Sequence, residues 1–306
     1  MIVPEIDLQT TLQAKETVNL QLYIVPTYEC NLACTQCYSK KYLPEYPAYL
    51  SWTNFINIYD MFKVNAKSFL FIGGEPSLWK FINESILFLQ NKNKKVSVFS
   101  NGTILLGVMP DDLIINGTNL LRETERNRIL SSLAIYRANG VNIKLRFNID
   151  STMKNQVGEI IKVAKQYAKS VSLSILYPST LDKQLGETVY CLAHSLASNS
   201  IKTEISRATP LCIFSDKERL YLQTNCFLKG MCKLPTNSFL VNPDGQTVQP
   251  CVELGIKRHI DELKTSSPKR LFMKSINEIR NNVGLQCFNC NLTGECSGGC
   301  LGYRLK

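Results

Sequence analysis

The stretch Cys30-Asn-Leu-Ala-Cys34-Thr-Gln-Cys37-Tyr38 stands shortly after an apolar run, over residues 20–25, that has the composition of a buried strand. It brings together three thiols, separated by three and then by two residues. Thiolates hold iron–sulfur clusters, and a cubane with only three protein sulfurs keeps one iron open to an outside ligand. Zinc sites usually take four ligands or include a histidine, and neither His194 nor His259 is near the motif. The spacing therefore favours an open iron–sulfur site over a zinc site or inert thiols.

From residue 20 onward, short strand-like runs alternate with longer helical patterns. This alternation is typical of parallel strands joined by right-handed crossover helices, in either a barrel or a doubly wound sheet. The helix over residues 120–139 is predicted to end at Asn139-Gly140, because Asn and Gly commonly stop helices. We predict strands over residues 20–25, 68–72, 96–100, 113–116, 141–149, 171–177 and 201–206, and helices over residues 52–64, 78–90, 120–139, 153–170 and 181–198.

Two of the predicted strands end in segments suited to ligand binding. The second ends in Gly73-Gly74-Glu75-Pro76, and the third in Ser100-Asn101-Gly102-Thr103. A Gly-Gly pair lets a backbone approach a ligand closely, and Glu75 adds a carboxylate at the same end of the sheet as the thiols. Taken alone, Gly-Gly-Glu-Pro would equally serve as an ordinary turn from a strand into a helix.

The cysteine motif, followed one βα unit later by Gly-Gly-Glu-Pro, resembles the signature of the radical S-adenosylmethionine (radical SAM) superfamily. The resemblance implies an α/β fold, a partial (β/α)6 barrel of the TIM type, with its chemistry at the C-terminal ends of the strands. It also implies that Cys30, Cys34 and Cys37 hold a [4Fe–4S] cluster whose open iron binds SAM. An electron from the cluster then splits SAM to a 5′-deoxyadenosyl radical, which abstracts hydrogen from a substrate carbon.

The same resemblance suggests further contacts to SAM. Tyr38 is expected near the adenine, and the segment Gly73, Gly74, Glu75 and Pro76 at the amino group. Asn116, at the end of the fourth strand, is expected near the carboxylate or the ribose, and Asn101, at the end of the third, is expected to contact the cofactor. One of Arg122, Arg126 and Arg128, with Arg126 taken as the candidate, would pair with the carboxylate, because a guanidinium binds carboxylate bidentately.

Polar and apolar residues alternate in Lys144-Leu-Arg146-Phe-Asn148-Ile-Asp150, so the predicted strand has one polar face. In a barrel strand, that face would line the interior and hold a polar substrate. An exposed edge strand is the alternative interpretation.

The last third of the chain is rich in cysteine, with eight cysteines between residues 212 and 300. Such a density indicates a small domain organised by metal rather than by a large core. The run Cys287-Phe-Asn-Cys290-Asn-Leu-Thr-Gly-Glu-Cys296-Ser-Gly-Gly-Cys300 resembles the SPASM extension of radical SAM enzymes, and so does a hairpin predicted at Pro243-Asp244-Gly245. A zinc ribbon is the alternative. We expect an arm at 1–19, the barrel at 20–207 and the SPASM domain at 208–306.

By this resemblance, two auxiliary [4Fe–4S] clusters are expected in the tail. Cys226, Cys232, Cys251 and Cys300 would hold the first, and Cys287, Cys290 and Cys296 the second, whose usual last cysteine is missing here. The spare thiol is Cys212. The sequence leaves three uses open for it: a ligand of the second cluster, a ligand of the first, or a catalytic donor of a hydrogen atom to a substrate radical.

The composition indicates the cellular compartment of the protein and the classes of partner that it binds. The chain has 306 residues, 12 cysteines and a formal charge of +10, with no signal peptide and no apolar run long enough for a membrane span. We expect a cytoplasmic protein with metal-bound cysteines rather than disulfides. Nucleic acid is not expected as a partner, because the basic clusters at 92–95 and 269–270 lack interleaved aromatics.

The expected function is modification of a ribosomally synthesised peptide, by cross-link, thioether, epimerisation or oxidation. Alternatives are a radical SAM dehydrogenase or epimerase of a small molecule and, more remotely, a non-catalytic iron–sulfur or zinc-binding protein. An electron donor such as flavodoxin or ferredoxin is implied. The arm of 19 residues is too short to form a leader-binding domain. Either a separate leader-binding protein supplies this function, the core sequence is read directly, or the substrate is a small molecule.

Overall fold

The computed structural model describes residues 19–35, 37–176, 182–281, 287, 289–292 and 294–304. Eight neighbouring strands run parallel in the order β8-β1-β2-β3-β4-β5-β6-β7, and two antiparallel strands, β9 and β10, extend the sheet beyond β8. The strands are β1 (Leu20–Ile24), β2 (Ala66–Phe71), β3 (Lys95–Ser100), β4 (Asp112–Asn116), β5 (Asn142–Ile149), β6 (Ser170–Ile175), β7 (Lys202–Ile205), β8 (Ser238–Val241), β9 (Thr247–Gln249) and β10 (Arg258–His259).

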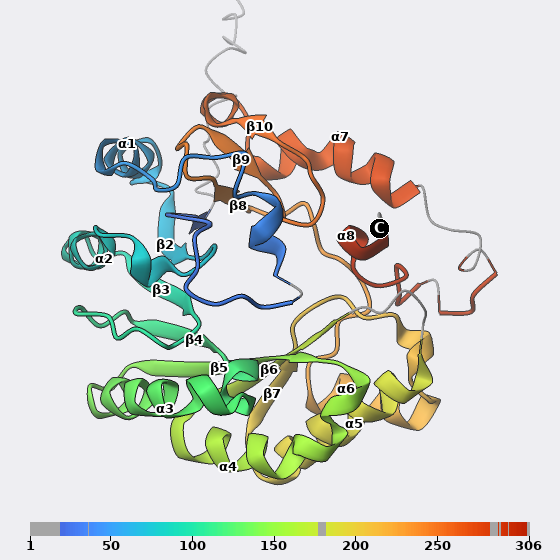
Figure 1. The fold of residues 1–306 in the computed structure, drawn as a ribbon. Helices are drawn as coiled ribbons and strands as arrows, with labels where there is room; N and C mark the ends of the chain where they lie inside the picture. The colour runs from blue at the N-terminus through green and yellow to red at the C-terminus, as the bar shows by residue number, and fades with distance from the viewer. Residues whose placement is uncertain are drawn as a thin grey trace, which may run out of the picture.

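The sheet curls into a barrel that is not closed, since β7 and β10 form its two edges. Figure 1 views the barrel from one end, with helices α1 to α5 around the outside of the strands. This arrangement confirms the predicted partial barrel. The helices are α1 (Trp52–Phe62), α2 (Ile82–Asn91), α3 (Glu123–Ala138), α4 (Val157–Tyr167), α5 (Lys183–Ser198), α6 (Asp216–Asn225), α7 (Pro268–Asn281) and α8 (Leu301–Arg304).

Three predicted helices begin three or four residues later than the sequence pattern indicated. The helix predicted over 78–90 begins only at Ile82, after a 3₁₀ turn, η3 (Pro76–Leu78). Residues 117–121 form a 3₁₀ turn, η4 (Gly117–Leu121), and Arg122 is extended, so α3 begins only at Glu123. The helix predicted over 153–170 is preceded by a 3₁₀ segment, η5 (Ser151–Gln156), and it stops at the extended residue Ala168, after which Ser170 opens β6. Tyr177 and Leu181, the ends of two predicted elements, lie outside the described residues.

The barrel core lies between the sheet and its helices. On β5, Ile143, Leu145, Phe147 and Ile149 are fully buried against this layer, whereas Lys144, Arg146 and Asn148 project to the opposite face. Because β5 lies between β4 and β6, it is not an edge strand. The polar face therefore lines the barrel interior, as the first of the two interpretations predicted.

The C-terminal part adds directly to the barrel sheet, because β8 pairs in parallel with β1. The predicted hairpin is confirmed: β8 and β9 pair antiparallel, and the Asp244 carboxylate accepts hydrogen bonds from the N–H groups of Gln246 and Thr247 across the turn. Figure 1 shows this hairpin and α7 at the top of the barrel. Among the described residues, no helix is long and apolar enough to cross a membrane.

Candidate functional site

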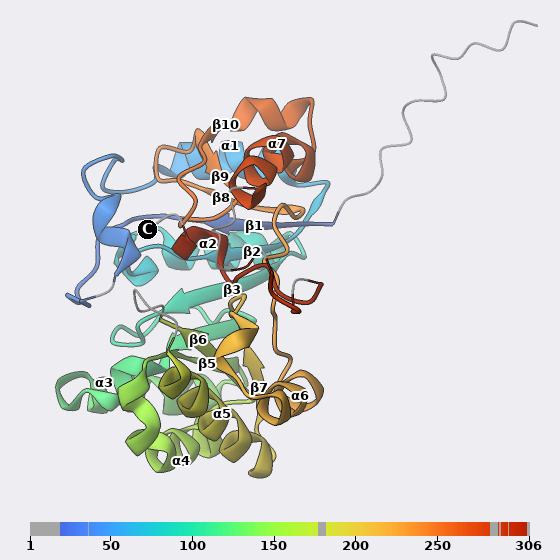
Figure 2. The ribbon, with the colours of Figure 1, turned by 90° about the vertical axis from the view of Figure 1, so that its right-hand side faces the viewer.

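The three-cysteine loop follows β1 and lies at the C-terminal ends of the barrel strands. Figure 2 shows this loop, in blue, at one end of the barrel, on the side towards which β1, β2 and β3 point. The thiols of Cys30, Cys34 and Cys37 are all free and half-buried. Cys37 also caps a short 3₁₀ helix, η2 (Tyr38–Lys41). The loop therefore holds its thiols where barrel enzymes place their chemistry.

Gly73 and Gly74 allow the segment after β2 to pack closely against the cysteine loop and to form backbone hydrogen bonds with it. The N–H of Gly74 donates to Thr27 O at 2.9 Å, and the N–H of Glu75 donates to Glu29 O at 2.8 Å. A Cβ on Gly74 would lie 2.0 Å from Glu29 O, and one on Gly73, whose φ is +141°, would lie 2.4 Å from Thr27 O. The glycines thus permit a close approach, as predicted, but what the backbone approaches here is the loop that carries the thiols.

Two side chains from the far end of the loop reach the same glycine. The hydroxyl of Tyr38 donates to Gly73 O at 3.0 Å, and the hydroxyl of Ser39 donates to it at 2.8 Å. Burial raises the pKa of Tyr38 above its ordinary value, so this phenol is neutral at physiological pH. The cysteine motif and the Gly-Gly-Glu-Pro segment form one hydrogen-bonded unit.

Glu75 joins β2 to β3 beneath this unit. Its carboxylate is fully buried and accepts hydrogen bonds from the N–H and hydroxyl of Ser77, the hydroxyl of Ser100 and the N–H of Asn101, the last at 2.6 Å. Burial raises the pKa of Glu75, and these donors act in the opposite direction. Glu75 therefore positions Asn101, and its predicted contact to a SAM amino group stays a prediction.

Asn101 contacts the cysteine loop directly. Its amide donates to Asn31 Oδ1 at 2.8 Å and lies 3.8 Å from Cys30 Sγ, which also accepts from the N–H of Leu32 at 3.4 Å. Burial raises the pKa of Cys30, and these two donors partly oppose the rise. Asn116, in contrast, accepts from the N–H of Thr118 and so caps η4.

Asn119, on η4, is a site residue that the sequence analysis missed. Its side chain is 1% exposed, and its Oδ1 lies 4.0 Å from Cys34 Sγ. Its Nδ2 has no hydrogen-bond partner among the described residues. A buried donor without a partner costs about 1–3 kcal/mol, so this amide is suited to a polar ligand beside Cys34.

The arginine at the cysteine loop is Arg122, not Arg126. The guanidinium of Arg122 lies 3.9 Å from Cys34 Sγ. Arg126 forms an ion pair with Glu159 on α4 and donates to Leu120 O. This placement moves the expected carboxylate-binding role from Arg126 to Arg122.

The C-terminal cysteines fall into two groups. The first group is Cys232, Cys251 and Cys300: burial raises the pKa of Cys251 to about 12 and also raises that of Cys300, and the thiols of the group add to both effects. In the second group, Cys212 is exposed, and its pKa is raised by burial and by the neighbouring Cys296, Cys287 and Cys290. The structure therefore places Cys212 with the second predicted ligand set.

Backbone contacts support the second group. The N–H of Leu211, next to Cys212, lies 3.5 Å from Cys296 Sγ. A Cβ on Gly230 would lie 2.2 Å from Glu295 O and 2.9 Å from Leu211 Cδ1, so these three segments are closely packed.

Cys226 stands apart from both groups. Its thiol is fully buried in the core and lies 3.8 Å from Ala193 O, and burial alone raises its pKa to about 11. Its predicted place in one ligand set with Cys232, Cys251 and Cys300 stays a prediction.

The donor chemistry fits iron–sulfur clusters at all three places, because each gathers thiols from adjacent backbone segments. No three Cys, His, Asp or Glu side chains in the described residues converge closely enough to bind one metal ion. The ligands of a cubane bind separate iron atoms, so they lie farther apart than the ligands of a single ion.

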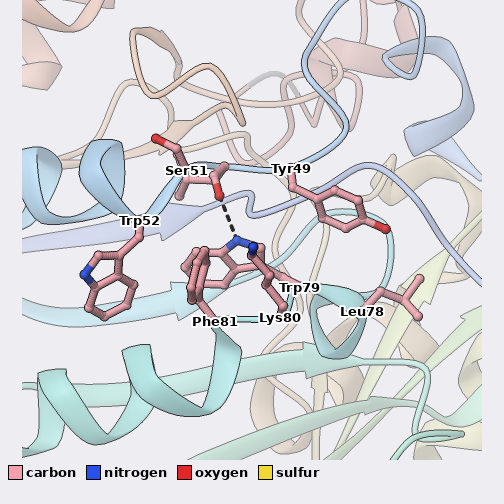
Figure 3. A pocket seen from close by; sticks show the side chains of 8 residues that line it. Tyr49, Ser51, Trp52, Leu78, Trp79, Lys80 and Phe81 are labelled. Atoms are coloured by element: carbon pink, nitrogen blue, oxygen red, sulfur yellow. Dashed lines mark hydrogen bonds between the residues drawn. The ribbon is translucent and has the colours of Figure 1, made fainter.

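An aromatic pocket lies on the outer side of the barrel, next to the site. It has a volume of about 610 Å³ and is lined by residues that follow the cysteine loop and the Gly-Gly-Glu-Pro segment, among them Tyr49, Trp52, Trp79 and Phe81. Figure 3 shows the indole N–H of Trp79 donating a hydrogen bond, which Leu50 O accepts at 2.8 Å. This bond ties the segment after β1 to the segment after β2.

Comparisons with known proteins agree with this architecture. SuiB of Streptococcus suis bound to S-adenosylmethionine matches with a TM-score of 0.64 and 14% identity, over 94% of this chain and 74% of SuiB. The structure of SuiB bound to its precursor peptide SuiA matches with the same TM-score. Native anSMEcpe with bound S-adenosylmethionine also matches with a TM-score of 0.64, at 18% identity over 92% of this chain and 89% of that one. At these identities the likeness shows the fold alone. No match was found among curated protein sequences.

The family model of the radical SAM superfamily matches residues 24–189, just over half of the chain. The match includes the cysteine loop, the Gly-Gly-Glu-Pro segment, Asn101, Asn119 and Arg122. The chain belongs to the radical SAM superfamily.

Proposed function

We propose that this protein is a SPASM-type radical SAM enzyme that modifies a peptide. The observation that carries the proposal is the hydrogen-bonded unit at the mouth of the barrel, in which the Cys30-Cys34-Cys37 loop is fastened to Gly73, Gly74 and Glu75. Such a unit holds three thiols in a fixed relation to the ends of β1, β2 and β3. A non-catalytic zinc or electron-transfer protein has no need for this arrangement.

In the proposed site, Cys30, Cys34 and Cys37 hold a [4Fe–4S] cluster, which supplies the electron that splits bound SAM to a 5′-deoxyadenosyl radical. Arg122 pairs with the SAM carboxylate, because its guanidinium already lies at Cys34. Asn119 donates its unpartnered Nδ2 hydrogen atoms to the same ligand. Tyr38, Asn101 and the Gly73–Pro76 segment complete the pocket, and Asn116 shapes it by capping η4.

For the auxiliary clusters, we propose Cys212, Cys287, Cys290 and Cys296 as one set of ligands. The closeness of Leu211 N–H to Cys296 Sγ supports Cys212 as a ligand rather than a hydrogen-atom donor. Cys232, Cys251 and Cys300 form the other set. Cys226 would join this set only by turning its thiol away from Ala193 O.

A peptide is the proposed substrate. Two neighbours of similar fold have been solved with peptides, SuiB with SuiA and anSMEcpe with the Cp18Cys peptide. The polar interior of this barrel, lined by Lys144, Arg146 and Asn148, suits a polar backbone. The proposal includes a cytoplasmic location, a flavodoxin or ferredoxin as electron donor, and a separate protein that presents the peptide.

The test is release of 5′-deoxyadenosine from anaerobically reconstituted protein with SAM and dithionite, measured by mass spectrometry. We expect the wild type to release it and Cys34→Ala to release none, because an incomplete ligand set cannot hold the cluster. Cys191→Ala, a half-buried cysteine of α5 outside all three groups, is the matched control and should retain release. Wild-type protein that binds iron and sulfide but leaves SAM intact would exclude the proposed function.

A further inference from the structure

Arg146 projects from the middle of β5 into the barrel interior. It is level with Asn116, the last residue of β4, and with Ser172 on β6. Its side chain is half-buried, so it keeps some accessible surface inside the barrel. Burial, with a contribution from Arg207, lowers the pKa of Arg146 to about 10, so the guanidinium is still charged at neutral pH. A deeply placed cation therefore faces a space that a ligand can reach.

The neighbours of Arg146 hold it in place without neutralising it. Its Nη2 donates to the hydroxyl of Ser174 at 3.0 Å, and its guanidinium carbon lies 5.6 Å from the centre of the Phe99 ring. The Phe99 ring and the Ser174 hydroxyl orient the guanidinium, but they leave most of its five N–H donors for other acceptors. Among the described residues, no carboxylate lies within ion-pair distance of Arg146.

Other cations of the barrel have carboxylate partners. Lys144 pairs with Glu204 at 3.2 Å, and Glu253 lies 3.9 Å from both Arg207 and Lys41. Arg146 has no such ion pair among the described residues, although Glu204 acts on it electrostatically, in the direction that raises its pKa. A buried charge without a counter-charge costs several kcal/mol, which makes it a poor device for stability.

We propose that Arg146 is the anchor for a carboxylate of the substrate, held in the barrel interior. The inference rests on the proposed function and adds the substrate class: a peptide or small acid that presents one carboxylate to the barrel. A guanidinium binds a carboxylate bidentately, and such a ligand would give Arg146 the ion pair that the described residues do not provide. The SAM carboxylate is assigned separately to Arg122, at the cysteine loop.

The test measures binding to SAM-loaded, reconstituted enzyme by calorimetry. The probes are N-acetylated pentapeptides with a central Glu or Gln, each as the C-terminal acid or amide, together with glutarate as a small acid. We expect wild type to bind carboxylate-bearing probes roughly tenfold or more tightly than the matched amides, the factor that about 1.4 kcal/mol provides. The carboxylate-bearing probe with the highest affinity identifies the source of the carboxylate, which is a side chain, a C-terminus or a small acid.

Arg146→Gln should abolish this preference. The matched control is the double variant D60N/K63Q, which removes an exposed charged pair at the end of α1 without changing the net charge, and which should keep the preference. Equal preference in Arg146→Gln and wild type, or no preference in wild type, would overturn the proposal. Release of 5′-deoxyadenosine by the same wild-type preparation shows whether the proposed function itself stands.

Two further measurements separate anchoring from other roles. If Arg146 served the fold, Arg146→Met would lower the urea midpoint. An anchoring role predicts an unchanged or higher midpoint, because an unpaired buried charge is removed. If Arg146 bound SAM instead, Arg146→Gln would weaken SAM binding roughly tenfold, whereas the proposal predicts unchanged SAM affinity. Either a lower midpoint or weaker SAM binding counts against the anchor.

Discussion

Asn119 is a buried side chain whose amide is only partly satisfied by the described residues. It is buried beside Cys34, yet its Nδ2 lacks a partner in the described part of the chain. Replacing a polar group that has no partner by an apolar one of similar size removes a desolvation cost. In the proposed site, the side chain would contribute to SAM binding at the expense of stability in the protein without SAM.

We predict that Asn119→Leu leaves the urea midpoint of the metal-free protein unchanged or raises it. The same change should weaken SAM binding to the reconstituted protein roughly tenfold, as expected for the loss of one hydrogen bond of about 1.4 kcal/mol. Equilibrium dialysis with labelled SAM checks the affinity. An unchanged affinity together with a lower midpoint would mean that Asn119 serves the fold.

Residue types revealed the cysteine loop and the Gly-Gly-Glu-Pro segment, because their members are close in sequence and chemically distinctive. Asn119 gave no such signal, and nothing local distinguished Arg122 from the other two arginines, since their contacts with Cys34 span 85 and 88 residues of sequence. The sequence shows no contact by which to choose among Arg122, Arg126 and Arg128. The ion pair of Arg126 with Glu159 depends on how α3 packs on α4, which a local pattern does not specify.

At the scale of elements, the close packing of β2's end against the cysteine loop depends on Gly74. Its Cβ position lies 2.0 Å from one backbone oxygen and 2.5 Å from another, those of Glu29 and Tyr28. Backbone atoms cannot move aside as a flexible side chain would, so any side chain here must push the loop from β2.

We predict that Gly74→Ala destabilises the protein by about 1–3 kcal/mol, the usual cost of overpacking, and lowers the iron content after reconstitution. Gly158→Ala on α4 is the matched control, because a Cβ there meets nothing within 4 Å. It should be neutral or slightly stabilising, as alanine is favoured over glycine in a helix. Iron and sulfide analysis, with urea unfolding, checks both. Full iron content in Gly74→Ala would show that the loop does not depend on this packing.

The strand order was predictable as far as the βα alternation extended, which is through β7. The pairing of β8 with β1 was not, because it joins residues more than two hundred positions apart by a pattern that any short strand shares. The late starts of three predicted helices could not be predicted either. The 3₁₀ turns that precede these helices have the same composition as a helix.

At the scale of the whole molecule, the cysteine-rich tail continues the barrel sheet through β8. Apart from that of Cys226, its thiols fall into two groups. Its two thiol groups combine segments from residue 212 to residue 300, so spacing alone could not assign them. The missing last cysteine of the SPASM pattern left Cys212 with three uses, and the packing of Leu211, Gly230 and Glu295 favours one.

We predict that reconstitution protects Cys212 from alkylation. In the metal-free protein this exposed thiol should react with iodoacetamide at alkaline pH, where more of it is thiolate, and iron–sulfur loading should suppress the reaction. Cys191 is the internal control, and its labelling should not change. Cys212→Ser should also lower the iron content by about four atoms per chain, the content of one cubane. Undiminished labelling of Cys212 in loaded protein would exclude it as a ligand.

The most direct test of the account is electron–nuclear double resonance on the reduced, reconstituted enzyme with SAM labelled at its amino nitrogen and carboxylate oxygens. The account predicts hyperfine coupling of both labels to an iron–sulfur cluster, present in wild type and in Cys191→Ala and lost in Cys34→Ala. A reduced cluster in wild type that shows no coupling to either label would contradict the claim that the Cys30-Cys34-Cys37 loop leaves one iron for SAM.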